Sequence, residues 1–200
     1  MYSYLALGDS YTIGEQVPFE QNFPNQAVQL LRTKHMDVSD PVIIATTGWT
    51  TDELQAAIRE HNIRETFSFV SLLIGVNNQY RGRSLENYRE EFSTLLNQAI
   101  HFAGGHVDKV FVLSIPDWGV TPFAGERDRA QIAREIDAYN DAAMGIAKSH
   151  RCHFIEITQS TRENGIHTDY LAPDGLHPSA KEYAIWASRL AGQVAAVFGK

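Results

Sequence analysis

The sequence predicts an α/β fold, a three-layer α/β/α sandwich around a five-stranded parallel sheet. Strand-like and helix-like segments alternate along the chain, which is the element order of parallel sheets with covering helices. The strand-like segments are continuous apolar runs, as expected for strands buried on both faces. Right-handed crossovers restrict how such strands connect, and we expect the flavodoxin-like strand order 2-1-3-4-5.

Five short runs rich in Val, Ile, Leu and Phe are the predicted strands, at residues 2–7, 41–47, 67–74, 109–115 and 153–157. Apolar residues at helical spacing predict five helices, at residues 25–34, 51–61, 84–102, 128–150 and 179–198. Two longer connections, residues 116–127 and 158–176, are expected to be loops with a functional role.

Length and composition fit one soluble globular domain over residues 1–200, because 44% of the residues are apolar and 20% are charged. The formal net charge of -7 argues against binding to nucleic acid or to an anionic membrane surface, which needs a basic patch. The single cysteine, Cys152, excludes an intrachain disulfide and a Cys-based metal cluster. Oligomeric state stays open.

The N-terminal segment has no charged region followed by an apolar stretch, so we expect no signal peptide. The longest apolar run, residues 69–76, is too short to cross a bilayer. We therefore expect a cytoplasmic protein without a transmembrane segment. Secretion stays open, since a signal removed beforehand would leave no trace.

Polar residues suited to catalysis follow four of the predicted strands. Ser10 follows the first strand, Gly48 the second and Asn77 the third. Asp174 and His177 follow the fifth strand and precede the last helix. Because the carboxyl ends of parallel strands meet at one edge of a sheet, we expect these five residues to form one cluster.

The residue types in this cluster suit nucleophilic catalysis. A serine hydroxyl is a weak nucleophile that needs a neighbouring base, and His177 can take the proton of Ser10. Asp174 lies three residues before His177, so one turn brings its carboxylate beside the imidazole. The backbone N–H groups of Ser10 and Gly48 and the side-chain amide of Asn77 are candidate oxyanion donors. We predict a serine hydrolase that needs no metal or other cofactor.

Four of these residues, in this order, make the chain resemble the SGNH hydrolase (GDSL-like lipase/esterase) family. Ser10, Gly48, Asn77 and His177 match the four residues for which that family is named, and residues 8–15 resemble its lipolytic branch. The resemblance spans residues 8–178 and implies the same fold and cofactor-free hydrolysis of esters. The G-x-S-x-G elbow of α/β-hydrolases is absent, because Thr12 stands at its last position.

Two positions depart from the family pattern. Tyr11 stands where the GDSL motif has Leu, and Asn78 stands where the family's third block has Asp. The resemblance implies that this Asp braces the oxyanion loop. Asn78 therefore bears on the rigidity of the loop, and Asn77 remains the expected donor.

Several activities remain open within this resemblance, which covers esterases, lipases, lysophospholipases, thioesterases and carbohydrate deacetylases. We expect cleavage of carboxylic esters of small molecules through an acyl-enzyme on Ser10. The same triad also suits thioesters, lysophospholipids or the O-acetyl groups of sugars. A non-catalytic ligand-binding domain is a further alternative, although it would be expected to lack a triad member.

Four aromatic residues, Trp49, Tyr80, Trp118 and Phe123, fall in predicted loops at the same edge of the sheet. We expect them to wall an acyl pocket, and their bulk predicts a narrow pocket for short acyl groups. Ordinary packing beneath the loops is the alternative.

Other polar residues are predicted to be structural. Asp9 is expected to brace the turn beside Ser10, and His167 is expected to be an exposed loop residue. The arginines in residues 127–134 are expected to lie on a solvated helix face. Cys152 is expected in the core or at its boundary.

Overall fold

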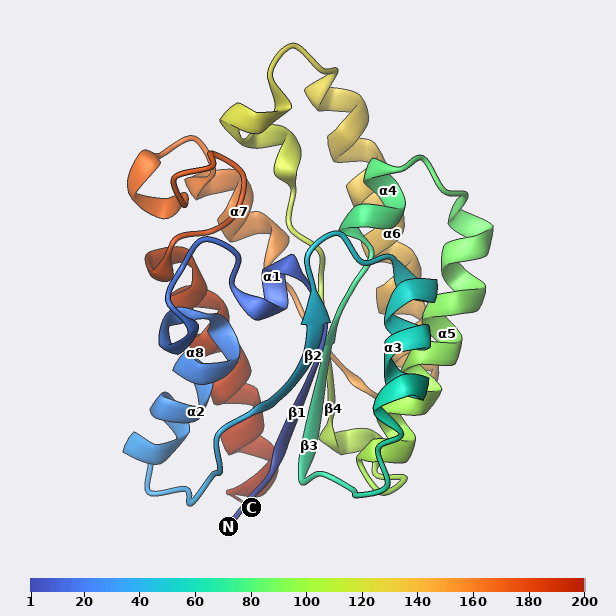
Figure 1. Cartoon of the computed structure of the whole chain (residues 1–200), viewed down its shortest axis with the longest axis vertical. Helices are drawn as coiled ribbons and strands as arrows, with labels where there is room; N and C mark the ends of the chain where they lie inside the picture. The colour runs from blue at the N-terminus through green and yellow to red at the C-terminus, as the bar shows by residue number, and fades with distance from the viewer. Residues whose placement is uncertain (200) are drawn as a thin grey trace.

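The computed structural model describes residues 1–199 and has a parallel five-stranded sheet between two layers of helices (Figure 1). The strand order is β2-β1-β3-β4-β5, which confirms the predicted topology. The strands are β1 (Tyr4–Asp9), β2 (Val42–Thr46), β3 (Phe69–Leu73), β4 (Val110–Leu113) and β5 (His153–Ile155). Every neighbouring pair is parallel, so all five carboxyl ends meet at one edge.

Five long helices cover the sheet, and three short helices lie near the carboxyl ends of the strands (Figure 1). The long ones are α2 (Phe23–Thr33), α3 (Thr51–His61), α5 (Leu85–Phe102), α6 (Arg129–Ser149) and α8 (Ala180–Phe198). The short ones are α1 (Ser10–Ile13), α4 (Val76–Tyr80) and α7 (Thr158–Asn164). Helices α2 and α8 cover one face of the sheet, while α3, α5 and α6 cover the other.

Burial of the strands explains their continuous apolar sequence. Every residue of β1, β3 and β4 is buried, because these strands lie inside the sheet and are covered on both faces. The edge strands β2 and β5 are partly exposed. Trp186 and Phe23 pack in the layer of α2 and α8, and Tyr88 and Phe92 of α5 fill the opposite layer.

Two segments predicted as loops contain α-helices, and the predicted loop at residues 116–127 contains two 3₁₀ helices, η3 (Trp118–Val120) and η4 (Pro122–Ala124). Residues 158–176, expected to be one long loop, contain α7 and the 3₁₀ helix η5 (Thr168–Tyr170). Helix α7 is polar throughout, and its buried Ser160 donates a hydrogen bond to Glu182 of α8 at 2.7 Å. Residues 76–80 form α4, which is too short to show a helical repeat. Both loop predictions were wrong because neither segment has an amphipathic pattern.

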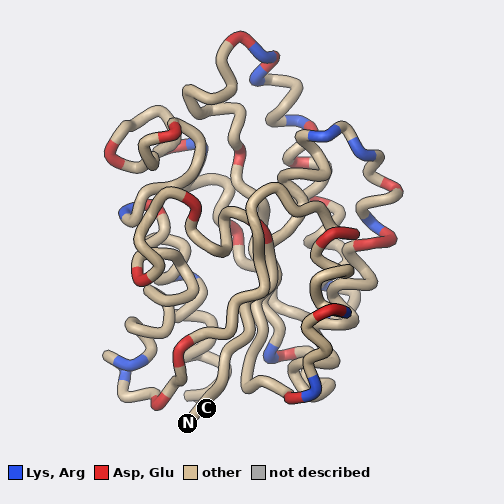
Figure 2. Tube along the Cα trace, viewed as in Figure 1, with Lys and Arg blue, Asp and Glu red and all other residues tan. Residues whose placement is uncertain are grey.

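Charged residues of both signs are interspersed along the outer helices and the connecting loops (Figure 2). Within residues 1–199, no helix combines the length and the apolar character that a membrane crossing requires. Cys152 is buried, which confirms its predicted position in the core or at its boundary.

Candidate active site

Ser10 begins α1 immediately after β1, at the carboxyl edge of the sheet. The predicted tight turn is a single helical turn, and Asp9 caps it by accepting the N–H of Tyr11 at 3.0 Å. Gly8 permits this fold-back, because a Cβ there would lie 2.0 Å from Oγ1 of Thr12 and 2.6 Å from the carbonyl oxygen of Leu73. The sharp reversal presents the Ser10 side chain beyond the strand end.

His177 and Asp174 lie in the turn that leads into α8. One oxygen of the Asp174 carboxylate accepts the backbone N–H groups of Leu176 at 2.9 Å and of His177 at 3.0 Å. Its other oxygen lies 2.6 Å from Nδ1 of His177. Nε2 of His177 lies 2.9 Å from Oγ of Ser10. Residues separated by 167 positions are therefore in hydrogen-bond contact, as the parallel topology predicts.

The charge of Asp174 favours one protonation pattern in this chain of contacts. Partial burial raises the pKa of Asp174, but hydrogen bonds from the ring and backbone N–H of His177 and from Leu176 outweigh it, so the pKa lies below its ordinary value. An ionised carboxylate accepts a hydrogen bond from Nδ1–H of His177, which keeps the proton on Nδ1 and leaves the Nε2 lone pair facing Ser10. This arrangement can take the hydroxyl proton from Ser10.

Asp9 behaves differently from Asp174 although both are near the serine. Asp9 is fully buried, and burial raises its pKa to about 7 despite hydrogen bonds from the N–H of Tyr11 and the Asn77 amide. It contacts the backbone of α1 and lies 3.4 Å from Nδ2 of Asn77. The structure thus confirms its expected role in bracing the turn.

The three candidate oxyanion donors line the same cleft as Ser10 and His177. Gly48 lies between β2 and α3, Asn77 lies in the first turn of α4, and the N–H of Ser10 lies at the start of α1, where helical N–H groups lack intrahelical partners. The Asn77 amide donates to the carbonyl oxygen of Trp49 at 3.0 Å. The start of α1, the connection between β2 and α3, and the first turn of α4 therefore meet at one cleft.

Asn78 fills a structural position in the network beneath the cleft. It is fully buried, accepts the N–H of Thr51 at 3.1 Å and donates to the Thr51 hydroxyl at 2.6 Å. The Thr51 hydroxyl in turn donates to the carboxylate of Glu91 on α5. The Asn78 amide therefore ties α4 to the start of α3. The Glu91 carboxylate of α5 accepts a hydrogen bond from the Thr51 hydroxyl.

The cleft has a volume of about 500 Å³, including its open mouth, and aromatic side chains form much of its wall. Three of the four predicted aromatic residues, Tyr80, Trp118 and Phe123, line it. The prediction that the Trp49 side chain walls the pocket was wrong, because this side chain packs against the core. Trp49 contacts the site through its carbonyl oxygen, which accepts the Asn77 amide. The lining residues not predicted from sequence are Tyr11, Thr47, Val76 and Leu176, each next to a predicted one.

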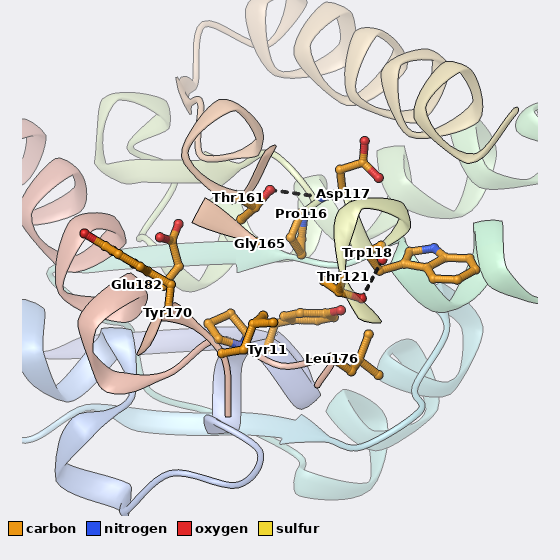
Figure 3. Close-up of a pocket in the computed structure, with 12 residues that line it drawn as sticks. Tyr11, Pro116, Asp117, Trp118, Thr121, Thr161, Gly165, Tyr170, Leu176 and Glu182 are labelled. Atoms are coloured by element: carbon orange, nitrogen blue, oxygen red, sulfur yellow. Dashed lines mark hydrogen bonds between the residues drawn. The ribbon is translucent and has the colours of Figure 1, made fainter. Parts of the chain in front are cut away.

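A second, smaller pocket of about 290 Å³ adjoins the cleft, and Tyr11 is one of the residues that line it (Figure 3). Tyr11, Trp118 and Leu176 line both spaces. The N–H of Asp117 donates to the Thr161 hydroxyl at 3.1 Å, which fastens the 3₁₀ helix η3 (Trp118–Val120) to α7. The indole of Trp118 itself donates to Oε1 of Gln79 on α4 at 2.7 Å.

Two arginines near the cleft were not predicted to have a local role. Arg127, expected on a solvated helix face, lies with its guanidinium carbon 5.8 Å, 5.6 Å and 5.4 Å from the ring centres of Tyr80, Trp118 and Phe123. Arg81 follows α4 and contacts the loop that carries Gly48. No spacing in the sequence links either arginine to the cleft. Among residues 1–199, no three His, Cys, Asp or Glu side chains are grouped as metal ligands would be.

The sequence matches the GDSL-like lipase/acylhydrolase family over residues 6–185, a span that includes Ser10 and His177. The chain belongs to this family. Membership makes the protein a hydrolase of carboxylic esters. No curated protein matches the sequence.

Solved structures of similar fold include TesA, with a TM-score of 0.76 at 17% identity over 98% of this chain and 99% of that one. The esterase EstA from Pseudoalteromonas sp., inhibited by monoethylphosphonate, has a TM-score of 0.71 at 14% identity over the full length of both chains. The acetylxylan esterase Axe2 from Geobacillus stearothermophilus has a TM-score of 0.75 at 20% identity over 96% of this chain and 94% of that one. These three structures share the α/β/α fold with this chain.

Proposed function

We propose that the protein cleaves esters of short-chain acids through a covalent acyl-enzyme on Ser10. The observation that carries this proposal is the continuous contact from Asp174 through His177 to Ser10, with distances of 2.6 Å and 2.9 Å. A hydroxyl, a base and an orienting carboxylate in this order are the parts of a serine nucleophile.

In the proposed reaction, His177 accepts the hydroxyl proton as Oγ of Ser10 attacks the acyl carbon. The carbonyl oxygen becomes an oxyanion that the N–H groups of Ser10 and Gly48 and the amide of Asn77 stabilise. His177 then protonates the leaving alcohol, and the acyl group remains on Ser10. A water molecule that gives its proton to His177 attacks the acyl-enzyme, and the acid is released.

The Asn77 amide has one N–H to spare for this purpose. Its contact with the carbonyl oxygen of Trp49 is 3.0 Å, whereas that with Asp9 is 3.4 Å. The weaker contact with Asp9 is the one that an oxyanion would replace, while the bond to Trp49 keeps the amide oriented.

Labelling with a fluorophosphonate probe tests the nucleophile. Wild-type protein should be labelled and should hydrolyse p-nitrophenyl acetate, whereas Ser10→Ala should do neither while keeping its circular dichroism spectrum. Ser93→Ala is the matched control and should be labelled normally, because Ser93 is a partly exposed serine of α5 that donates to the carbonyl oxygen of Arg89. Absence of labelling in the wild type would favour a non-catalytic ligand-binding domain.

The aromatic walls of the cleft support the preference for short acyl groups. Tyr80, Trp118 and Phe123 leave little room for a long chain beside Ser10. A series of p-nitrophenyl esters from C2 to C12 should show kcat/KM falling as the chain lengthens, and a maximum at C12 would contradict this. Acyl-CoAs, lysophospholipids and acetylated sugars assayed in parallel distinguish the alternatives that share the triad. The predicted cytoplasmic location is testable by cell fractionation.

A further inference from the structure

Arg81, the residue after α4, connects two parts of the site that the proposed mechanism uses separately. Its Nη2 donates to the carbonyl oxygen of Gly48 at 2.6 Å. Its Nη1 lies 3.3 Å from Oε1 of Glu53 on α3. The other carboxylate oxygen of Glu53 accepts the N–H and hydroxyl of Thr50. The guanidinium is therefore held from one side by the helix and grips the Gly48 loop on the other.

Gly48 is a residue whose orientation needs such a grip. Its φ of +84° lies in the left-handed region that glycine adopts freely, and its lack of a Cβ leaves the two flanking peptides free to rotate. A Cβ at this position would have the Nη2 atom of Arg81 as its nearest contact, at 3.6 Å. The carbonyl that Arg81 holds shares its peptide plane with the N–H of Trp49, which donates to the carbonyl oxygen of Thr46 at 3.3 Å. Together these two bonds fix the peptide that follows Gly48, which leaves fewer orientations for the N–H that precedes it.

The next carbonyl in the loop is held in the same way. The carbonyl oxygen of Trp49 accepts the Asn77 amide at 3.0 Å, so consecutive carbonyls bind donors from α4 and from the residue that follows it. Two proposed oxyanion donors, the N–H of Gly48 and the amide of Asn77, are thereby tied together by a pair of hydrogen bonds across two loops.

The ionisation of Glu53 supports this arrangement. Burial raises its pKa, but hydrogen bonds from the N–H and hydroxyl of Thr50 and from Arg81 outweigh it, so the pKa lies below its ordinary value. Glu53 is therefore a carboxylate at neutral pH and can orient the guanidinium. Since both side chains are partly exposed, the ion pair contributes little to the free energy of unfolding. Its main effect is to orient the guanidinium of Arg81.

We propose that Arg81 is a positioning residue that holds the N–H of Gly48 toward the oxyanion, with Glu53 orienting its guanidinium. This inference rests on the proposed function, because it assigns Arg81 to the oxyanion hole of that reaction. Arg81 acts through Gly48 and does not touch the reacting atoms. Its loss should therefore weaken one donor without removing it.

Kinetics of Arg81→Ala on p-nitrophenyl acetate test the proposal. We expect kcat to fall by about tenfold, less than the ~10²–10³ loss for a deleted oxyanion donor, with KM changed less than about twofold. Guanidinium chloride at millimolar concentration should restore several-fold of the lost kcat, because the free ion can occupy the vacated place between Gly48 and Glu53.

Arg83→Ala is the matched control. Arg83 lies two residues after Arg81 and pairs with Asp52 of α3 and Glu91 of α5. Its replacement removes the same charge, but its side-chain contacts do not include Gly48. Its kcat should stay within about twofold of the wild type, and guanidinium should leave it unchanged. Arg81→Lys keeps the charge but replaces the planar fork, whose two nitrogens bind Gly48 and Glu53 separately, by a single ammonium nitrogen. It tests the proposal if Arg81→Ala does not fold, and kcat should fall several-fold.

Equal kcat values for Arg81→Ala and Arg83→Ala would overturn the proposal, as would a loss seen only in KM or a loss that guanidinium does not reverse. With Arg81→Lys as the only folded variant, wild-type kcat would overturn it. A wild type that neither hydrolyses esters nor reacts with fluorophosphonate would instead refute the proposed function. The two failures are therefore distinguishable.

Discussion

Two buried or partly buried carboxyl groups near Ser10 have pKa shifts in opposite directions. Asp174 accepts three N–H groups, including that of the His177 ring, and its pKa is lowered. Asp9 is enclosed by the core, and its pKa is raised to about 7. Both carboxyl groups accept hydrogen bonds that lower the pKa, so access to water decides the direction: complete burial outweighs these bonds at Asp9, and partial burial does not at Asp174. We therefore expect Asp174 to affect activity and Asp9 to affect the pH dependence of stability.

Asp174→Asn should lower kcat on p-nitrophenyl acetate by roughly 10³–10⁴. An asparagine amide can donate to Nδ1 of His177, which would leave the proton on Nε2 and prevent it from accepting the Ser10 hydroxyl proton. Asp169→Asn is the control, because Asp169 pairs with Lys181 in an exposed position of the same segment. A variant at position 174 with more than a tenth of wild-type kcat would show that this carboxylate does not orient the base.

Asp9→Asn should become more stable relative to the wild type as pH rises. Native Asp9 keeps its proton up to about pH 7, whereas in the unfolded chain it ionises near its ordinary pKa of 3.8. The native state thus binds more protons between these values, so wild-type stability falls across this range, by about 2 kcal/mol from pH 5 to pH 8. Asparagine has no carboxyl group to titrate, so the stability of the variant lacks this pH dependence. Urea unfolding of both proteins at pH 5 and pH 8 measures the difference, and parallel pH dependences would contradict it.

At single residues, the sequence predicted which side chains lie in contact where chemistry and spacing coincide, and their catalytic roles stay predictions. Ser10, Asp174 and His177 follow strands, and the three-residue spacing of the last two suits one turn. Arg81 has no such signal, because its bond to Gly48 depends on how the end of α4 faces a loop 33 residues away. Trp49 was misjudged for a related reason, since position in a loop does not tell whether the ring or the carbonyl faces the site.

Between elements, the start of α3, α4 and the middle of α5 meet at the Thr51 hydroxyl. Thr51 receives a hydrogen bond from Asn78 and gives one to Glu91, so each group has a definite donor or acceptor role. The departure from the family pattern at Asn78 is therefore matched by a carboxylate at position 91. These contacts fix α4, which carries Asn77, against α3.

Asn78→Asp should destabilise the protein by about 1–3 kcal/mol at neutral pH, because two carboxylates would compete for the single Thr51 hydroxyl proton. Adding Glu91→Gln should recover part of the loss, since glutamine can donate to Thr51. Urea unfolding of both single variants, the double variant and the wild type gives the coupling. Purely additive effects would argue against the network, as would wild-type stability of Asn78→Asp.

Element prediction worked for helices with a repeating apolar stripe and failed for those without one. The predicted helix at residues 51–61 coincides with α3, whose capping box of Thr50 and Glu53 marks its start. Helix α7 is stabilised by polar contacts with α8 and η3 that only the folded chain supplies. Short or polar helices at the functional edge are thus the elements that sequence periodicity misses.

For the whole molecule, the parallel strand order follows from the alternation of elements and from chain chirality, and it was predicted from sequence for that reason. The topology brings the segments that carry Ser10 and His177 to the same edge of the sheet. The volume of the cleft and the second pocket behind Tyr11 were not predictable, because they depend on how η3, α7 and the turn before α8 pack together.

Unfolding should be a single cooperative transition if residues 1–200 form one domain. Trp186 lies in the core between α2 and α8, whereas Trp118 lies at the cleft. Fluorescence from these indoles and the far-UV circular dichroism signal should give coincident urea curves. Two separated transitions would show that the chain divides into independent units.

The segment before β1 and the end of α8 lie side by side at the base of the sheet (Figure 1). The ring centres of Tyr2 and Phe198 are 4.8 Å apart there. The cleft opens at the opposite end. Anchoring the protein to a support through a short tag near either residue should therefore leave the ester-cleaving end facing the solution. The same proximity makes circular permutants feasible, with a short peptide bridging these residues and new ends opened in an exposed turn such as the glycine pair Gly104 and Gly105.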